Sequence, residues 1–300
     1  MTNATAAIEA RGLGKRYGHR WALADCTLTI PAGHVAGLVG PNGAGKTTLI
    51  SLATGMLAPT TGTVEVLGGP PASGPDQLAR VGYVAQDTPT YAGLSVADHL
   101  RLGAHLNPCW DAALADRRIE QLGLDPKQKA GKLSGGQRAQ LALTVAIAKR
   151  PELLILDEPI ASLDPRARRE FLQVLMNVTA EEELSVVLSS HQVADLERVS
   201  DYLIVLIDSR VRIDGEVDDL LATHHLLTGP RRDNARLPAS QQVITQSHTG
   251  RQSTFLVRSS EPIIDPAWTV DPVSLEDLVL AYLGHTSGGS ADIKTLEAKR

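Results

Sequence analysis

The sequence predicts an α/β fold with a largely parallel central sheet covered by helices on both faces. Four apolar runs have the length of buried strands, at residues 34–39, 152–157, 185–190 and 201–207. Helix-patterned stretches lie between these runs. Continuous apolar runs are typical of strands buried on both faces, and their alternation with helices favours a parallel sheet.

The N-terminal part predicts strands on either side of a glycine-rich loop. The first thirty residues alternate in character and predict short antiparallel strands. The run at 34–39 ends at the loop, after which "TTLISLATGML" has helical periodicity. Residues 61–69 and 80–86 predict two further strands bounded by turn residues.

Residues from about 87 to 150 predict a helical subdomain. Ser95 followed by Asp98 is typical of a helix N-cap with a carboxylate in the first turn. Gly123 has the position of a helix C-terminal signal. The subdomain is expected to end at Arg150, since Pro151 disfavours a helical residue before it.

The chain changes character after about residue 222. A polar stretch with proline and glycine precedes "QQVITQS" and "STFLVRS", which predict a hairpin, and "VSLEDLVLAYLG", which predicts a short capped helix. Residues 1–222 are therefore expected to form the main domain and 223–285 a small α+β accessory region. Residues 286–300 are polar and are expected to form a mobile tail.

Composition excludes several classes of protein. The chain is 43% hydrophobic and 21% charged, which is ordinary for a soluble globular protein, and its net charge of −5 gives no general attraction to nucleic acid. Cys26 and Cys109 lack metal-ligand spacing and are expected to be reduced. The first residues have no signal-peptide pattern, and no apolar run is long enough to span a bilayer.

A phosphate-binding loop is the first functional motif. "GPNGAGKT" at 40–47 fits the complete G-x-x-x-x-G-K-[ST] pattern, after a predicted strand and before a predicted helix. Backbone N–H groups of such a loop surround phosphates, Lys46 adds a positive charge and Thr47 can reach Mg²⁺. The strand and helix context disfavours a chance glycine-rich turn, so we expect a nucleotide site.

Two adjacent carboxylates form the second motif. In "LLILDEP" (153–159), Asp157 ends a buried strand and Glu158 follows it directly. A carboxylate pair in this position is costly unless a metal and a reaction use it. Asp157 is a candidate Mg²⁺ ligand, and Glu158 is a candidate general base for an attacking water.

A second glycine-rich helix start stands in "KLSGGQRAQL" (132–141). Ser134 can cap this helix, and that is sufficient to explain a serine there. The start of a helix is also an anion site, because free N–H groups and the positive end of the helix dipole meet there.

These motifs together resemble the ATP-binding cassette of ABC transporters. "GPNGAGKT", "LSGGQ", "LLILDEP", "SLD" (162–164) and His191 occur in the order of that family, over about residues 8 to 220. The resemblance implies a P-loop cassette with a parallel-sheet core, an N-terminal antiparallel β subdomain and a helical subdomain. It also implies an ATPase that uses ATP and Mg²⁺.

The resemblance assigns a role to each site residue. His191 would act with Glu158 in catalysis, and Thr47, Gln86 and Asp157 would hold the metal. Asp164 would connect two active sites, and Tyr17 would stack on adenine. The residues implied in ATP binding are Tyr17, Gly40, Pro41, Asn42, Gly43, Ala44, Gly45, Lys46, Thr47, Thr48, Gln86, Ser134, Gly135, Gly136, Gln137 and Asp164.

The family also implies partners. Two cassettes, identical or different, would bind two ATP molecules head to tail, each between the Lys46 loop of one chain and the Ser134–Gly136 stretch of the other. Integral membrane permease subunits would carry the cargo, and the dimer would lie peripherally on the cytoplasmic face of the membrane. The helix in "VSLEDLVLAYLG" resembles the terminal helix of bacterial drug and antibiotic export cassettes, which favours export.

Three other readings stay open from the sequence. An importer ATPase is one, although the large C-terminal domain of sugar importers would not fit in residues 223–300. A soluble cassette ATPase acting on nucleic acid or ribosomes is disfavoured by the single cassette and the lack of a heptad run. A phosphotransfer kinase is disfavoured by the paired acids and the "LSGGQ" helix.

Overall fold

The structure is a computed structural model that describes residues 6–88, 90–181, 184–231 and 237–284. Its centre is a six-stranded sheet in the order β5-β6-β7-β3-β8-β9. The strands are β3 (Val35–Val39), β5 (Val81–Val84), β6 (Leu153–Asp157), β7 (Ser185–Ser190), β8 (Tyr202–Ile207) and β9 (Arg210–Glu216). The first five in that order are parallel, and only β9 runs antiparallel to its neighbour. The predicted parallel core is confirmed.

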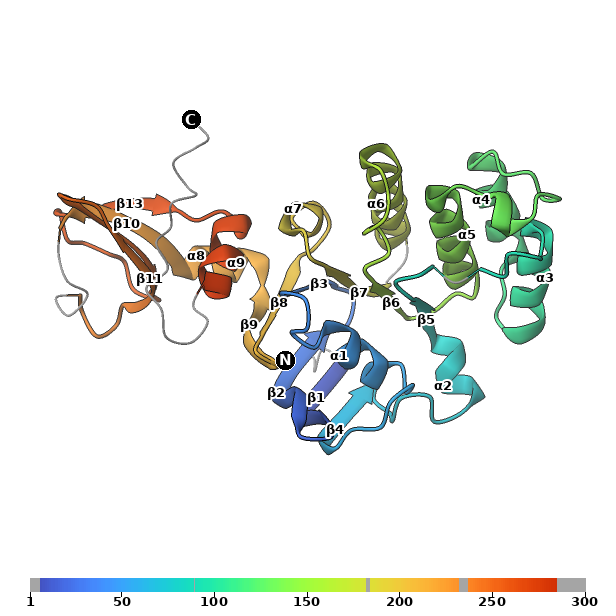
Figure 1. The fold of residues 1–300 in the computed structure, drawn as a ribbon, viewed down its shortest axis with the longest axis horizontal. Helices are drawn as coiled ribbons and strands as arrows, with labels where there is room; N and C mark the ends of the chain where they lie inside the picture. The colour runs from blue at the N-terminus through green and yellow to red at the C-terminus, as the bar shows by residue number, and fades with distance from the viewer. Residues whose placement is uncertain (1–5, 89, 182–183, 232–236, 285–300) are drawn as a thin grey trace.

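Both faces of this sheet are buried, which explains the continuous apolar runs. On β6, Leu154 and Leu156 belong to one hydrophobic cluster, whereas Leu153 and Ile155 belong to another. The side chains therefore alternate between two cores, although every residue of the strand is apolar until Asp157. In Figure 1, α6 (Pro165–Glu181) and α7 (Val193–Leu196) lie on one side of the sheet and α1 (Lys46–Ala53) lies on the other.

A second, three-stranded antiparallel sheet in the order β2-β1-β4 covers the α1 side. It consists of β1 (Ala6–Tyr17), β2 (Arg20–Pro31) and β4 (Thr61–Val66), and it is followed by α2 (Pro75–Arg80). The sequence suggested several short strands here, but β1 and β2 are each 12 residues long. Register shifts between the two strands interrupt the alternation, so long bulged strands look like short ones.

The helical group lies at the right-hand end of the molecule in Figure 1. It contains α3 (Val96–Leu106), α4 (Ala112–Gln121), the 3₁₀ helix η1 (Ala130–Lys132) and α5 (Gly135–Ala148). Ser95 and Asp98 form a reciprocal capping box, as predicted, and Gly123 has φ +61° just after α4. Helix α5 ends two residues before the predicted Arg150, which instead has φ +55°. Pro151 explains this early end, because it disfavours helical backbone in the preceding residue.

The C-terminal region forms a four-stranded antiparallel sheet in the order β11-β12-β10-β13, with two helices. Its elements are α8 (Val217–Thr223), β10 (His224–Pro230), β11 (Gln242–His248), β12 (Gln252–Arg258), β13 (Thr269–Pro272) and α9 (Leu275–Gly284). The structure contains the predicted hairpin as β11 and β12, and α9 is capped by Ser274, whose hydroxyl accepts from the Asp277 N–H. The expected mobile tail at 286–300 lies outside the described residues.

Candidate functional site

The glycine-rich loop joins the end of β3 to the start of α1, in the strand-to-helix setting that its motif requires. Gly45 is the N-cap of α1 and has φ +110°. A Cβ at this position would lie 2.4 Å from the Ala22 carbonyl oxygen, so only glycine fits. The structure thus places the predicted set Gly40 to Thr48 at one helix start, where backbone N–H groups are available to an anion.

Lys46 is buried at the first position of α1, with 5% of its surface exposed. Its Nζ donates to the Gly40 carbonyl at 2.8 Å and lies 3.3 Å from Glu158 Oε1. The loop and the carboxylate after β6 therefore meet, although more than a hundred residues separate them in sequence. A buried ammonium of this kind is stabilised by the paired carboxylate.

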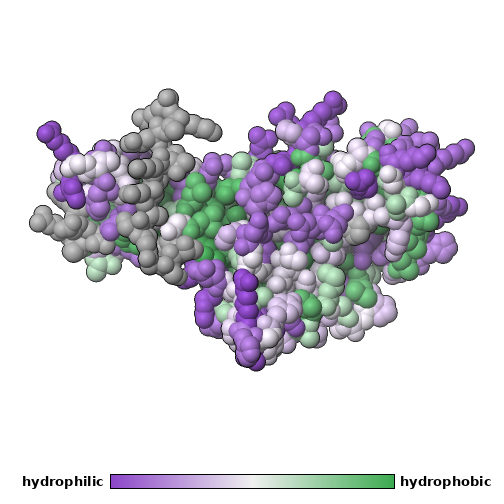
Figure 2. Space-filling view, in the orientation of Figure 1, coloured by the Kyte–Doolittle hydropathy of each residue, from purple (hydrophilic) through white to green (hydrophobic). Residues whose placement is uncertain are grey.

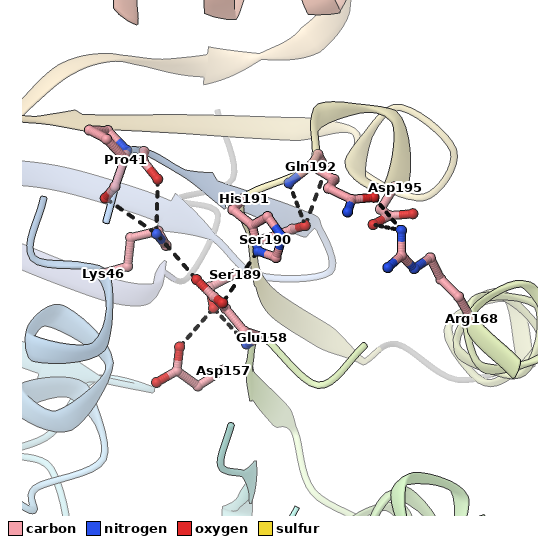
Figure 3. A network of polar contacts seen from close by, with 11 residues as sticks. Pro41, Lys46, Asp157, Glu158, Arg168, Ser189, Ser190, His191, Gln192 and Asp195 are labelled. Carbon is pink, nitrogen blue, oxygen red and sulfur yellow. Dashed lines mark hydrogen bonds and ion pairs between the residues drawn. The ribbon is translucent and has the colours of Figure 1, made fainter. Parts of the chain in front are cut away.

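Asp157 and Glu158 are held at the end of β6 by Ser189 on the neighbouring strand β7 (Figure 3). The Ser189 hydroxyl donates to Asp157 Oδ1 at 2.8 Å and accepts from the Glu158 N–H at 2.8 Å. One side chain thus fixes both acids. Ser189 was not among the predicted site residues, although a polar residue at the end of a buried strand is a signal that could have identified it.

Glu158 adopts an uncommon backbone conformation, with φ +46°. Few non-glycine residues occupy this left-handed region, and the cost of holding one there is about 1–3 kcal/mol. Such conformations are found preferentially at functional sites. Here it turns the chain sharply after Asp157, so that neighbouring carboxylates face different partners.

His191 lies directly after β7, and its Nδ1 is 3.4 Å from Glu158 Oε2. The histidine side chain is 43% exposed and that of the glutamate 12%. Lys46 and His191 therefore approach the two oxygens of one carboxylate. The structure therefore brings these three predicted residues together from α1 and from the ends of β6 and β7.

Gln86 follows β5 and is exposed, two residues beyond the end of that strand. On β5 itself, burial raises the pKa of Tyr83, and the nearby Asp157 carboxylate raises it further. The neutral Tyr83 ring thus stands next to the acid at the neighbouring strand end. Tyr17, the expected adenine partner, ends β1 with 52% of its surface exposed, and Lys15 Nζ lies 5.6 Å from its ring centre.

The "LSGGQ" stretch begins α5 in the helical group. Ser134 and Gln137 form a capping box, in which each side chain accepts from the backbone N–H of the other. A Cβ at Gly136 would lie 2.8 Å from the Ala167 Cβ of α6. Helix α5 packs against α3, α4, α6 and β5, whereas α1 packs against β2, β4 and β6. The two glycine-rich helix starts therefore belong to different packing groups.

Asp164 caps the start of α6. Its Oδ1 accepts from the backbone N–H groups of Arg166 and Ala167, at 2.9 Å and 3.0 Å. Asp164, which the sequence predicted to connect two active sites, thus caps a helix within its own chain.

The donor set fits a magnesium ion. Thr47, Gln86 and Asp157 offer a hydroxyl, an amide and a carboxylate, and oxygen donors are the ligands that Mg²⁺ prefers. No group of three or more His, Cys, Asp or Glu side chains that could hold a metal occurs in the described part of the chain. A site with one protein carboxylate suits a metal that also takes phosphate oxygens and water.

This combination of parallel sheet, phosphate loop and strand-end acids defines a P-loop nucleotide-binding protein. A family profile described as "ABC transporter" matches residues 23–161. The thiamine import ATP-binding protein ThiQ of Salmonella typhimurium is 32% identical over 201 residues, which cover 65% of this chain and 86% of that protein. The phosphonates import ATP-binding protein PhnC 1 of Haloquadratum walsbyi is 35% identical over 209 residues, covering 66% and 69%.

Solved structures agree with these relatives. A structure described as the ATP-binding subunit of an ABC transporter superposes with a TM-score of 0.65 at 28% identity, covering 72% of this chain and 92% of that one. The fold is also that of cbiO1 from Clostridium perfringens, with a TM-score of 0.62 at 23% identity, covering 73% and 91%. The chain belongs to the ABC transporter family and is an ATP-hydrolysing transport ATPase.

The helices of the described ranges include none with the length and apolar character needed to cross a membrane.

Proposed function

We propose that this chain binds ATP and Mg²⁺ at the phosphate loop and hydrolyses ATP as a head-to-tail dimer to drive transport through separate membrane subunits. The observation that carries the proposal is that Lys46 and His191 approach the two oxygens of the Glu158 carboxylate. When water attacks a terminal phosphate, a cation can stabilise the phosphate charge, a carboxylate can accept a proton from the water, and a histidine can help to hold both.

The residues have distinct chemical tasks in this proposal. Lys46 stabilises the charge of the outer phosphates, and Glu158 takes a proton from the attacking water. His191 helps to hold that water and the terminal phosphate. Magnesium, held by Thr47, Gln86 and Asp157, supplies charge neutralisation on the phosphate oxygens.

The second helix start supports a site shared between two chains. Ser134 and Gly135 begin α5, which packs with α3, α4, α6 and β5 rather than with α1. Its free N–H groups would meet the ATP that a second copy binds with its own Lys46 loop. Two-fold symmetry then creates two equal sites, and ATP holds the dimer closed.

The dimer is tested with the Glu158→Gln variant, which is expected to bind ATP but hydrolyse it slowly. Size-exclusion chromatography with Mg²⁺ and ATP should show a dimer that disappears without nucleotide. Adding Ser134→Arg should abolish the dimer while ATP binding to the monomer persists, and Ser240→Arg, an exposed serine of the C-terminal region, is the matched control. A dimer that survives Ser134→Arg would contradict the shared site.

An apolar groove supports a protein partner at the helical group. A cavity of about 440 Å³ lies between β5, α2 and α3, and exposed apolar side chains surround it. These are Met56, Leu78, Tyr91, Leu102 and Leu106. Figure 2 shows hydrophobic side chains in this part of the surface, at the lower right. We assign the groove to a permease subunit, which would place the ATPase peripherally on the cytoplasmic face of the membrane.

The named relatives support import as the direction of transport. ThiQ and PhnC 1 are described as import proteins, whereas the sequence resemblance of the C-terminal helix had favoured export. Disruption of the gene separates the two directions. Loss of growth on one limiting nutrient would support import, whereas unchanged growth with lower tolerance to toxic compounds would support export.

A further inference from the structure

Arg168 lies in the first turn of α6, four residues after Asp164. Its Nη1 donates to the side-chain oxygen of Gln192 and lies 3.6 Å from Asp195 Oδ2 (Figure 3). Gln192 directly follows His191, and Asp195 is on α7. The Arg168 guanidinium therefore connects α6 to Gln192 and to Asp195, near the two ends of the segment from His191 to Asp195.

Val193 anchors this segment in the main hydrophobic cluster, whereas the His191 side chain lies at the surface. The histidine side chain is 43% exposed. The Ser190 hydroxyl, before the histidine, accepts from the Gln192 N–H after it at 3.0 Å, so the backbone makes a short turn at His191. The turn fixes the local backbone shape, and Ser189 ties the preceding end of β7 to the Glu158 N–H. Arg168 supplies a connection from a different element.

An ordinary surface ion pair would stabilise the chain by little, about 0–1 kcal/mol. The Arg168 contact differs in its burial, since the side chains of Arg168 and Asp195 are only 21% and 11% exposed. In addition, Arg168 Nε is buried without a hydrogen-bond partner among the described residues. An unsatisfied buried donor costs stability. A contact that carries this cost is better explained by its place beside His191 than by stability alone.

We propose that Arg168 is a positioning residue that holds the segment from His191 to Asp195 and thereby sets the place of His191 against Glu158. The inference rests on the proposed function, because it acts through the proposed roles of these two residues. A residue that misplaces a catalytic group by about 1 Å can slow a reaction by about 100-fold.

The test is a double-mutant cycle in the full-length chain, measured as single-turnover hydrolysis of radiolabelled ATP. Arg168→Met keeps an unbranched apolar side chain but removes the guanidinium. In the wild-type background it should slow hydrolysis by about 10- to 100-fold with unchanged ATP affinity. In the His191→Ala background it should cause no further slowing, since the group that it positions is gone.

Two further variants make the result specific. Arg166→Met is the matched control, because Arg166 is in the same turn but is 87% exposed and pairs with Glu170. It should hydrolyse ATP like the wild type. Gln192→Ala removes one Arg168 partner without changing α6 and should reproduce a part of the slowing, which keeps the test valid if Arg168→Met unfolds.

The outcomes separate the two proposals. Equal slowing by Arg168→Met in both backgrounds would overturn the positioning role, as would a wild-type rate in both Arg168→Met and Gln192→Ala. If the wild-type chain binds ATP but does not hydrolyse it, the proposed function itself fails. Slowing that vanishes without His191 supports the assignment.

Discussion

The Lys46 ammonium nitrogen lies 3.3 Å from Glu158 Oε1, and both side chains are largely buried, with 5% and 12% exposed. The cation of the phosphate loop and the candidate base thus form an ion pair. Binding of a nucleoside triphosphate places more negative charge beside Lys46, so the ion pair between Lys46 and Glu158 is expected to rearrange when the nucleotide binds. Both residues can be tested separately.

Lys46→Ala should weaken ATP binding by about 10- to 100-fold, because a charge-assisted hydrogen bond contributes about 1.5–3 kcal/mol. Fluorescence titration with a labelled ATP analogue measures the affinity. Lys127→Ala, at an exposed lysine of the helical group, is the control and should bind normally. Normal affinity in the Lys46→Ala variant would remove the loop from the nucleotide site.

Glu158→Gln should retain ATP binding and slow hydrolysis by about two to four orders of magnitude, since the amide cannot accept a proton from water. Phosphate release under saturating ATP measures the rate. The slow variant should also accumulate the ATP-bound dimer. A rate near that of the wild type would exclude Glu158 as the general base.

Ser189→Ala should destabilise the chain by about 1–3 kcal/mol and lower the hydrolysis rate, because Asp157 and the Glu158 N–H both lose a partner. Urea unfolding and phosphate release measure the two effects. Ser200→Ala is the matched control, since Ser200 Oγ is buried and has no hydrogen-bond partner in the described ranges. The two variants should differ clearly, and equal stability would refute the bridging role.

Leu106→Glu should prevent assembly with the permease while leaving the ATPase activity of the isolated chain unchanged. Leu106 borders the apolar groove and is 71% exposed, so a carboxylate there costs the fold little. Co-purification with the permease subunit measures assembly. Met176→Glu, at an exposed apolar residue of α6 outside the groove, should assemble normally. Loss of assembly in both variants would argue against the groove.

Acid should destabilise the junction of the C-terminal region through His224. This histidine is fully buried between the Leu220 carbonyl, 2.6 Å from Nδ1, and the Tyr282 hydroxyl, 3.0 Å from Nε2. Burial lowers its pKa, and the hydrogen bond to Leu220 opposes that shift in part. The unfolded chain therefore takes up a proton at a higher pH than the folded one.

The resulting pH dependence has a defined sign. The free energy of unfolding should be highest above the ordinary histidine pKa of about 6.5 and should fall as the pH decreases below it, until the folded chain is also protonated. Urea unfolding between neutral pH and pH 5 measures the slope. His224→Gln should reduce the slope, and an unchanged slope in this variant would exclude His224 as its cause.

Much of the site could be predicted because its signals are local. The Lys46 loop, the Asp157–Glu158 pair and the Ser134 cap each occupy a few consecutive residues, and local hydrogen bonding or strand burial explains each pattern. The contacts of Ser189 and Arg168 join residues 24 to 32 positions apart. They depend on which strands become neighbours, and the sequence pattern does not contain that information.

The elements missed from the sequence have a similar explanation. Helix α8 and strand β10 follow each other without a turn signal, since Thr223 ends one and His224 begins the other. Strand β13 is four residues long and exposed, so it lacks an apolar alternation. Its strand conformation is set by pairing with β10. Short elements of this kind are determined by tertiary pairing rather than by local pattern.

The C-terminal sheet shares one apolar cluster with the ATPase domain. Leu196 on α7 and Leu203 on β8 belong to the same cluster as Leu256 on β12 and Leu278 on α9. A chain cut after residue 222 would therefore expose a face that the intact protein keeps dry, and exposed apolar surface of this kind promotes aggregation. In the intact chain, β12 and α9 therefore cover apolar side chains of α7 and β8, on the flank that follows His191 in sequence.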